Sequence, residues 1–234
     1  MLSKFLIKIF FLRSKLTRNP FEKNKIYLKY FKKFNSLLES SSGTTLEVHY
    51  KLRFHEICKI IKKYRIKKVL EMGTGRTTFV FNIIPNIKCL SIEQDEKWLK
   101  NLNRIFKLCN INFKVHLSKF LLIKKGGKFK ILPNFKPDML YIDGPYLPSK
   151  KKRKFNTFTG KPAYYDFETL FLRNHFPKVI MIEGRTDTAD AILKSKHASK
   201  YRFYGEFIYS IQRGLFFSSL SLRRHSIFLL KDKI

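Results

Sequence analysis

One short segment constrains the fold of this chain more than any other: the run EMGTGRTT, from Glu71 to Thr78. Its two glycines follow the stretch 69–72, which predicts a short strand, and precede residues 77–84, whose pattern predicts a helix. Gly73 and Gly75 allow a turn with positive φ and leave room for a ligand against the backbone. A glycine pair between a strand and a helix predicts a parallel sheet with a ligand site at the carboxyl ends of its strands.

Downstream of residue 67, predicted strands alternate with predicted helices. We expect strands at 69–72, 88–93, 113–117, 139–143 and 179–183, and helices at 77–84, 96–108, 165–174 and 187–194. Two further strands, 201–207 and 226–230, have no helix between them and predict an antiparallel edge. The expected fold is therefore a three-layer, Rossmann-like α/β sandwich with a mostly parallel sheet of about seven strands.

The first part of the chain predicts helices at 20–39 and 45–64, separated by a serine-rich break that ends at Gly43. We divide the chain into a basic, helical N-terminal extension, 1–45, and one domain, 46–234. Residues 1–16 have too short an apolar run to span a bilayer, but their alternating basic and apolar residues suit peripheral contact with a membrane surface.

The chain carries a formal net charge of +32 over 234 residues. This charge predicts an anionic partner, which includes nucleic acid as an alternative to a small polar or anionic molecule. Of the 49 basic residues 36 are lysine, so a compositional origin of the charge has equal weight, because nucleic-acid readers favour arginine. The three cysteines, Cys58, Cys89 and Cys109, lack metal-site spacing and predict a reduced, cytoplasmic compartment.

Two acidic residues stand at the ends of later predicted strands. Glu93 ends the second strand, where a carboxylate is placed to accept the hydroxyls of a ribose. Asp143 ends the strand 139–143 and is followed by Gly144 and Pro145, which predict a tight turn. We expect Asp143 at the reacting end of the site, with a role as turn cap as the alternative.

Taken in order, EMGTG, the IE that ends at Glu93, and DMLYIDGP resemble the motifs of class I SAM-dependent methyltransferases over residues 67–231. The resemblance implies that Glu71, Gly73 and Gly75 line the methionine end of S-adenosyl-L-methionine (SAM) and that Glu93 holds its ribose. It places Ser118 near the adenine amine. A dinucleotide site fits less well, because Thr78 stands where G-x-G-x-x-G requires its last glycine.

Two subclasses of that family remain to be weighed. Catechol-type O-methyltransferases hold a divalent metal near Asp143, but here the next strand ends in Glu183–Gly184–Arg185 and lacks the expected Asn. We therefore expect no metal, and Arg185 to pair with Glu183 or to bind an anion. Enzymes that methylate amino groups of nucleic acids carry Asp/Asn-Pro-Pro-Tyr, and Asp143–Gly144–Pro145–Tyr146 departs from it.

The resulting prediction is a SAM-dependent methyltransferase that acts on a small polar acceptor, such as a sugar or a saccharide-linked hydroxyl. Asp143 is its predicted catalytic residue, and the basic segment 147–165 is expected to form the acceptor side of the pocket. The alternatives are an RNA or DNA methyltransferase, favoured by the net charge, and a non-catalytic binding protein with the same fold.

Overall fold

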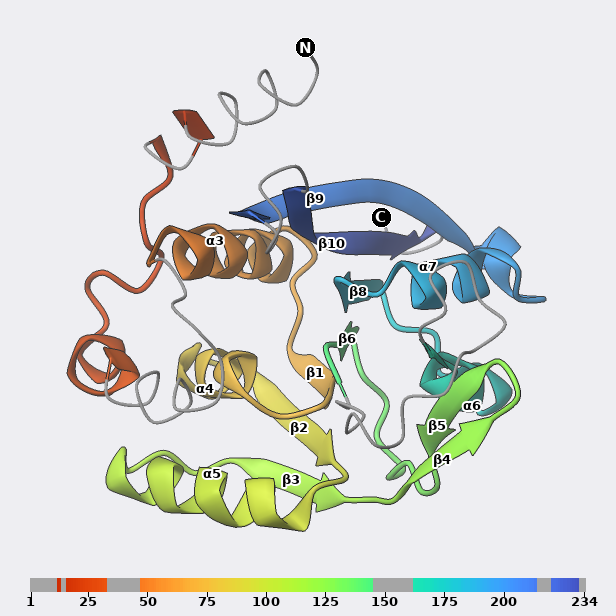
Figure 1. Ribbon diagram of the computed structural model, residues 1–234, viewed down its shortest axis with the longest axis horizontal. Helices are drawn as coiled ribbons and strands as arrows, with labels where there is room; N and C mark the ends of the chain where they lie inside the picture. The colour runs from red at the N-terminus through yellow and green to blue at the C-terminus, as the bar shows by residue number, and fades with distance from the viewer. Residues whose placement is uncertain (1–11, 14–15, 33–46, 145–161, 214–219, 232–234) are drawn as a thin grey trace. The chain divides into compact units, whose positions relative to one another are not determined.

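The computed structural model describes residues 12–13, 16–32, 47–144, 162–213 and 220–231 (Figure 1). The chain divides into two compact units. One unit comprises the residues up to Arg65 together with Glu206–His225, and the other comprises Ile66–Gly205 together with the residues from Ser226 onward. The strands β9 (Tyr201–Arg213) and β10 (Leu220–Leu230) each run through both units.

The larger unit contains the expected parallel strands, in the order β3-β2-β1-β6-β8, with β10 and β9 following β8 in the same seven-stranded sheet. The parallel strands are β1 (Lys68–Met72), β2 (Lys88–Glu93), β3 (Lys114–Leu117), β6 (Met139–Ile142) and β8 (Val179–Glu183). The helices are α4 (Arg76–Ile83), α5 (Glu96–Leu108), α6 (Asp166–Leu172) and α7 (Thr186–Leu193). The prediction of a mostly parallel, Rossmann-like sheet with an antiparallel edge is confirmed.

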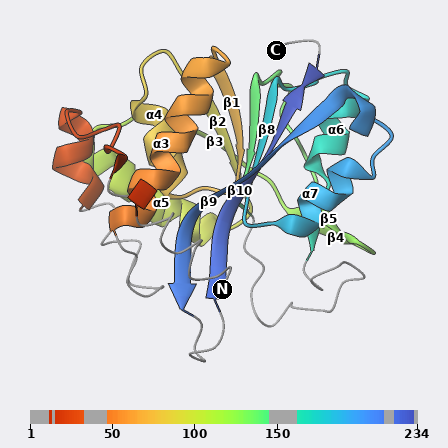
Figure 2. The same cartoon turned by 90° about the horizontal axis from the view of Figure 1, so that it is seen from above.

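Helices cover both faces of this sheet. Figure 2 shows α4 and α5 on one face and α6 and α7 on the other. The central strands β1, β6 and β8 are accordingly buried along almost their whole length, which explains why their sequences read as continuous apolar runs. The helix α5 instead has one apolar face, which buries Leu102, Ile105 and Phe106, and Asp95 caps its first turn through the amide of Trp98.

A second, three-stranded sheet was not predicted from the sequence. Its strands are β4 (Phe120–Ile123), β5 (Gly126–Phe129) and β7 (Ala163–Tyr164), in the order β4-β5-β7. β4 and β5 form an antiparallel hairpin, and β7 pairs with β5 in parallel. A Cβ atom on Gly126 would lie 2.0 Å from the carbonyl oxygen of Ala163, so this pairing requires a glycine.

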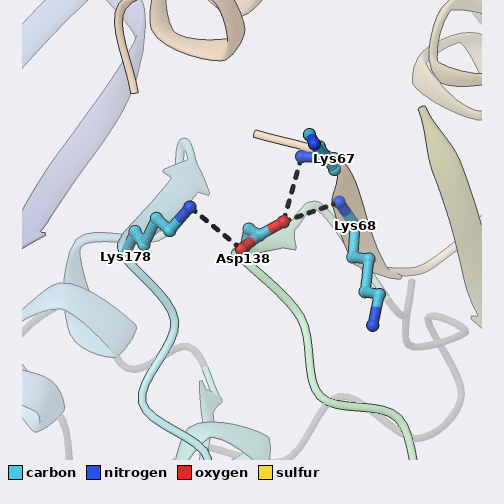
Figure 3. A network of polar contacts seen from close by, with 4 residues as sticks. All are labelled: Lys67, Lys68, Asp138 and Lys178. Carbon is cyan, nitrogen blue, oxygen red and sulfur yellow. Dashed lines mark hydrogen bonds and ion pairs between the residues drawn. The ribbon is translucent and has the colours of Figure 1, made fainter. Parts of the chain in front are cut away.

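Asp138 ties three central strands together at the edge of the sheet where they begin (Figure 3). Its Oδ2 accepts hydrogen bonds from the amides of Lys67 and Lys68, each at 3.0 Å, and its Oδ1 lies 3.2 Å from the Lys178 ammonium. Partial burial alone would raise the pKa of Asp138, but these hydrogen bonds and the Lys178 charge outweigh it and lower the pKa. Asp138 therefore fixes the register of β1, β6 and β8 at the edge opposite the strand ends that carry the predicted site.

The smaller unit is organised by aromatic side chains packed against α3 (Glu47–Lys63). Phe21, Tyr27, Phe31, Tyr50 and Phe54 form one cluster of stacked and edge-to-face rings, all of them buried. Residues 25–32 are helical, with a π-helical turn at Tyr27–Phe31, whereas 33–46 lie outside the described residues. Within the described ranges, no helix is long and apolar enough to cross a membrane.

Candidate functional site

The loops that follow β1, β2 and β6 meet at one edge of the main sheet. The amide of Gly73 donates to the carbonyl of Ile92 at 2.8 Å, which joins the loop after β1 to the end of β2. The amides of Asp143 and Gly144 both donate to the carbonyl of Met72, at 3.1 and 2.7 Å, which joins the same loop to the end of β6. Backbone hydrogen bonds thus bring three of the predicted motifs together at the carboxyl ends of adjacent strands.

The two glycines of the loop after β1 have different roles. Gly73 has a φ of 83°, and a Cβ atom there would lie 2.5 Å from the Cα of Gly144, so both its conformation and its contact require glycine. The prediction of positive φ at Gly75 was wrong: its φ is 172°, which is extended backbone. No atom lies within 4 Å of the Cβ position of Gly75, so among the described residues this side of the loop is open.

Glu71 lies fully buried beneath the loop. Three hydroxyl groups donate to its carboxylate: Thr77 at 2.5 Å, Thr78 at 2.7 Å and Ser91 at 2.6 Å. Burial raises the pKa of Glu71 to about 7, although the three hydroxyls lower it, and the charge of Asp143 raises it further. Thr78 also accepts a hydrogen bond from the amide of Gly75 at 2.8 Å, so Glu71 holds the glycine loop in place through Thr78.

Glu93 stands at the end of β2 and faces the same loop. One carboxylate oxygen accepts from the amide and the hydroxyl of Thr74, at 3.0 and 2.6 Å. The other accepts from the amides of Gln94 and Asp95, at 2.7 and 3.0 Å. The indole of Trp98 donates to the hydroxyl of Thr74 at 3.0 Å and so completes this network. Glu93 is thereby fixed in position beside the open loop, with its carboxylate restrained by four donors.

Asp143 follows β6 and is held by a residue of the next strand end. Its backbone carbonyl accepts from Nε of Arg185 at 2.8 Å, and Nη2 of Arg185 also donates to it. Nη1 of Arg185 donates to the phenol oxygen of Tyr164 at 2.9 Å, and the guanidinium lies 4.4 Å from the centre of the Tyr164 ring. The pKa of Tyr164 is raised, chiefly by burial, while Arg185 lowers it and Asp143 raises it, which places all three side chains near one another.

Arg185 is the site residue that the sequence located but whose role it did not predict. We expected it to pair with Glu183 or to bind an anion. Instead it bridges the Asp143 turn and Tyr164, while Glu183 accepts a hydrogen bond from the phenol of Tyr141 at 2.7 Å. From the sequence, Tyr164 was one of three residues, with Tyr165 and Asp166, that could reach the site from the predicted helix 165–174; the structure places it in β7, where it contacts Arg185.

Ser118 lies beside the site but is engaged in holding the backbone. Its amide donates to the carbonyl of Glu93 at 2.8 Å, and its hydroxyl accepts from the amide of Ile131 at 3.0 Å. The hydroxyl keeps its own proton for a further acceptor. Of the segment 147–165, which was predicted to form the acceptor side of the pocket, residues 147–161 lie outside the described residues, whereas Ala163–Tyr164 form β7.

Asp166 is a second buried carboxyl close to Tyr164. It is fully buried at the start of α6, and its Oδ1 accepts from the amide of Phe129 at 2.8 Å. Burial raises its pKa to about 7. It thus supports the contact between α6 and β5. The described residues contain no group of three or more His, Cys, Asp or Glu side chains that could hold a metal ion.

Comparisons with known proteins reveal the fold and no sequence relative. No protein-family model matches the chain, and no curated protein matches it. A solved structure from Staphylococcus aureus, provisionally assigned as a caffeoyl-CoA O-methyltransferase, matches with a TM-score of 0.51 at 13% identity. The match covers 97% of this chain and 98% of the other.

The chain has the class I methyltransferase fold. Two further structures match with lower TM-scores. One is a provisionally assigned RNA methyltransferase from Pyrococcus horikoshii, with a TM-score of 0.49, 11% identity and coverage of 86% and 98%. Another is the O-methyltransferase TomG from Streptomyces achromogenes, in complex with SAM, with a TM-score of 0.42, 9% identity and coverage of 85% and 97%. The fold places the glycine loop, Glu93 and the Asp143 turn at the edge where open α/β sheets bind their ligands.

Proposed function

We propose that this chain binds SAM at the loops after β1, β2 and β6 and transfers its methyl group to a small polar acceptor, such as a sugar or a saccharide-linked hydroxyl. One observation carries the proposal. Two carboxylates, on Glu93 and Asp143, stand beside an open glycine loop in a chain whose net charge is +32, and the buried carboxyl of Glu71 lies beneath that loop. A negative site in so basic a protein favours a cationic ligand over a phosphate-bearing one.

The residues at this edge fit SAM in chemical character. The carboxylate of Glu93 is suited to accept from ribose hydroxyls, a role that requires the Thr74 hydroxyl to yield its place. The open space beside Gly75 allows a ligand to approach the backbone. Ser118 can offer its hydroxyl proton to the adenine ring. Glu71 lies beneath the loop and acts on a bound ammonium group by its charge and by holding Thr78.

When bound, SAM supplies an electrophilic methyl group on a positively charged sulfur. The protein must then align the acceptor with that methyl group and exclude water from both. Asp143 is the proposed catalytic residue, which orients an acceptor hydroxyl and takes its proton as the oxygen becomes nucleophilic. Arg185 keeps Asp143 in place by clamping its backbone carbonyl, and Tyr164 keeps Arg185 in place.

The choice of a small acceptor draws on two points. The S. aureus structure with the same fold is assigned as an O-methyltransferase, which methylates oxygen. The turn at Asp143–Gly144 packs against the end of β1. Its two amides donate hydrogen bonds to the carbonyl of Met72, and Gly144 lies in close contact with Gly73. This turn lacks the Pro-Pro sequence of enzymes that methylate amino groups of nucleic acids.

The test is calorimetric binding of SAM and of its demethylated product to the full chain, with NAD(H) as the competing cofactor. We expect SAM to bind with micromolar affinity and Glu93→Ala to weaken binding at least tenfold. Glu96→Ala is the matched control, because Glu96 is an exposed carboxylate on α5, paired with Lys100, that lies outside the network of Glu93. A folded protein that does not bind SAM, or that binds NAD(H) instead, would refute the proposal. If SAM does bind, the next step is a methylation screen with sugars and RNA as acceptors.

A further inference from the structure

The smaller unit contains an open hollow with four cationic side chains among its lining residues. It encloses about 490 Å³ between α3 and the segment 18–23. The lining comprises Arg18, Asn19, Pro20, Glu22, Lys23, His55, Cys58, Lys59 and Lys62. Four of these residues are always cationic at neutral pH and one, Glu22, is a carboxylate. We call this feature the basic hollow.

The cations of the basic hollow are brought together by local structure. On α3, His55, Lys59 and Lys62 follow the i, i+4, i+7 spacing that places side chains on one face of a helix. The opposing segment is anchored by Phe21, which is buried and contacts the Phe54 ring edge-to-face at 6.1 Å between centroids. The side chain of Asn19 accepts from the amide of Phe21 at 3.0 Å and closes a turn there. Arg18 and Lys23 are therefore held on either side of a fixed point.

These positive charges are not neutralised by their neighbours. Among the described residues, no carboxylate lies within ion-pair distance of Arg18, Lys23, Lys59 or Lys62. The buried Glu56 offsets this positive charge only in part. Desolvation raises its pKa above the ordinary value and so disfavours its charged form, although the charge of Lys59 lowers the pKa. Four cations held together beside a single lining carboxylate repel one another, and a polyanion that enters the hollow relieves this repulsion.

We propose that the basic hollow is a binding site for a compact molecule that carries two or more linked phosphate groups. The shape of the hollow favours such a ligand over a nucleic acid. Cations from two segments converge on one concavity, which suits a small cluster of negative charges. The exposed residues Lys100, Arg104 and Lys107 of α5 instead follow one another along a single helix and would suit an extended backbone.

All residues of the basic hollow belong to the smaller unit, whereas Glu71, Glu93 and Asp143 belong to the larger one. The proposal of a phosphate site therefore does not depend on SAM binding. Lys59 and Lys62 are exposed, so glutamine at these positions removes charge without leaving a buried gap.

The experiment uses inorganic tripolyphosphate as the probe and calorimetry on the full chain at 50 and 200 mM salt. We expect binding that weakens with salt and that the double variant Lys59→Gln/Lys62→Gln weakens at least tenfold. The matched control, Lys136→Gln/Lys196→Gln, removes the same charge from two exposed positions outside the hollow and should change affinity less than twofold. Circular dichroism checks that both variants are folded, and unchanged SAM binding separates this result from the fate of the methyltransferase proposal.

Two results would overturn the proposal. One is that tripolyphosphate does not bind, or that both double variants weaken its binding equally. Equal weakening would mean that the net charge of the protein, and not a defined site, attracts the ligand. The other comes from a twelve-nucleotide single-stranded RNA measured beside it. If Lys59→Gln/Lys62→Gln weakens RNA binding more than tripolyphosphate binding, the surface serves a nucleic acid and not a compact phosphate ligand.

Discussion

The buried carboxyl of Glu71 should make the stability of this protein depend on pH in a way that one substitution removes. Its pKa is raised from an ordinary 4.5 to about 7, because burial disfavours the charged form more than the hydroxyls of Thr77, Thr78 and Ser91 favour it. A group whose pKa is higher in the folded state binds its proton more tightly there. Its stabilising contribution is therefore complete below pH 4.5 and is lost as the pH rises through 7.

The size of this effect follows from the two pKa values. The difference between 4.5 and about 7 corresponds to about 3 kcal/mol of unfolding free energy, at about 1.4 kcal/mol for each unit of pKa. The substitution Glu71→Gln keeps the shape and one acceptor oxygen but cannot ionise. The unfolding free energy of the variant minus that of wild type should therefore be about 3 kcal/mol larger at pH 8 than at pH 4.

The assay is urea unfolding of both proteins at pH 4 and pH 8, with the free energy extrapolated to water. Comparing the variant with wild type at each pH cancels the contributions of all other titrating groups. Glu96→Gln serves as the control, because it makes the same substitution at a carboxylate that is exposed on α5 and not buried. A Glu71→Gln difference that is the same at pH 4 and pH 8 would refute the reasoning.

Four further substitutions test other parts of the molecule. Gly144→Ala should lower the unfolding free energy by about 1–3 kcal/mol, because its Cβ would lie 2.6 Å from the Cα of Gly73. Gly75→Ala, which meets no atom within 4 Å, should change stability by less than about 1 kcal/mol but weaken SAM binding; equal losses of stability in urea unfolding would contradict this contrast. Asp138→Ala should cost about 1–3 kcal/mol at pH 7, since it leaves the amides of Lys67 and Lys68 without their acceptor. Because the pKa of Asp138 is lowered, this cost should shrink as the pH falls below 3.8, and a cost that grows on acidification would be evidence against the role of Asp138. Arg185→Lys should slow methyl transfer at least tenfold while SAM affinity stays within threefold, and equal effects on both in a coupled turnover and calorimetric assay would argue against a positioning role.

The sequence determined the main sheet because the pattern of apolar and polar residues reflects which positions are buried. Runs such as those of β1, β6 and β8 are apolar at most positions, since helices cover both faces of the sheet, and the alternation with amphipathic helices then implies parallel strands. Strand β2, helix α5 and strand β8 occupy the residues predicted for them. The strand-end positions of Glu93 and Asp143 followed from the same pattern, because a carboxylate after an apolar run marks the end of the strand.

The tertiary structure alone decided what each of those side chains contacts. The sequence could not reveal β4, β5 and β7, since they are short and β5 begins with two glycines, which single-sequence propensity assigns to a turn. Gly126 is needed because β7 lies against β5 too closely for a side chain, and Gly127 is needed because a Cβ there would lie 2.3 Å from the Phe120 ring and 2.7 Å from the carbonyl oxygen of Leu121 in β4. Likewise, Glu71 was expected to face a ligand, and only the fold showed three hydroxyls from a helix and a neighbouring strand closing over it. Local pattern records which positions are buried, whereas partners distant in sequence are chosen by packing, and a single sequence carries no record of that choice.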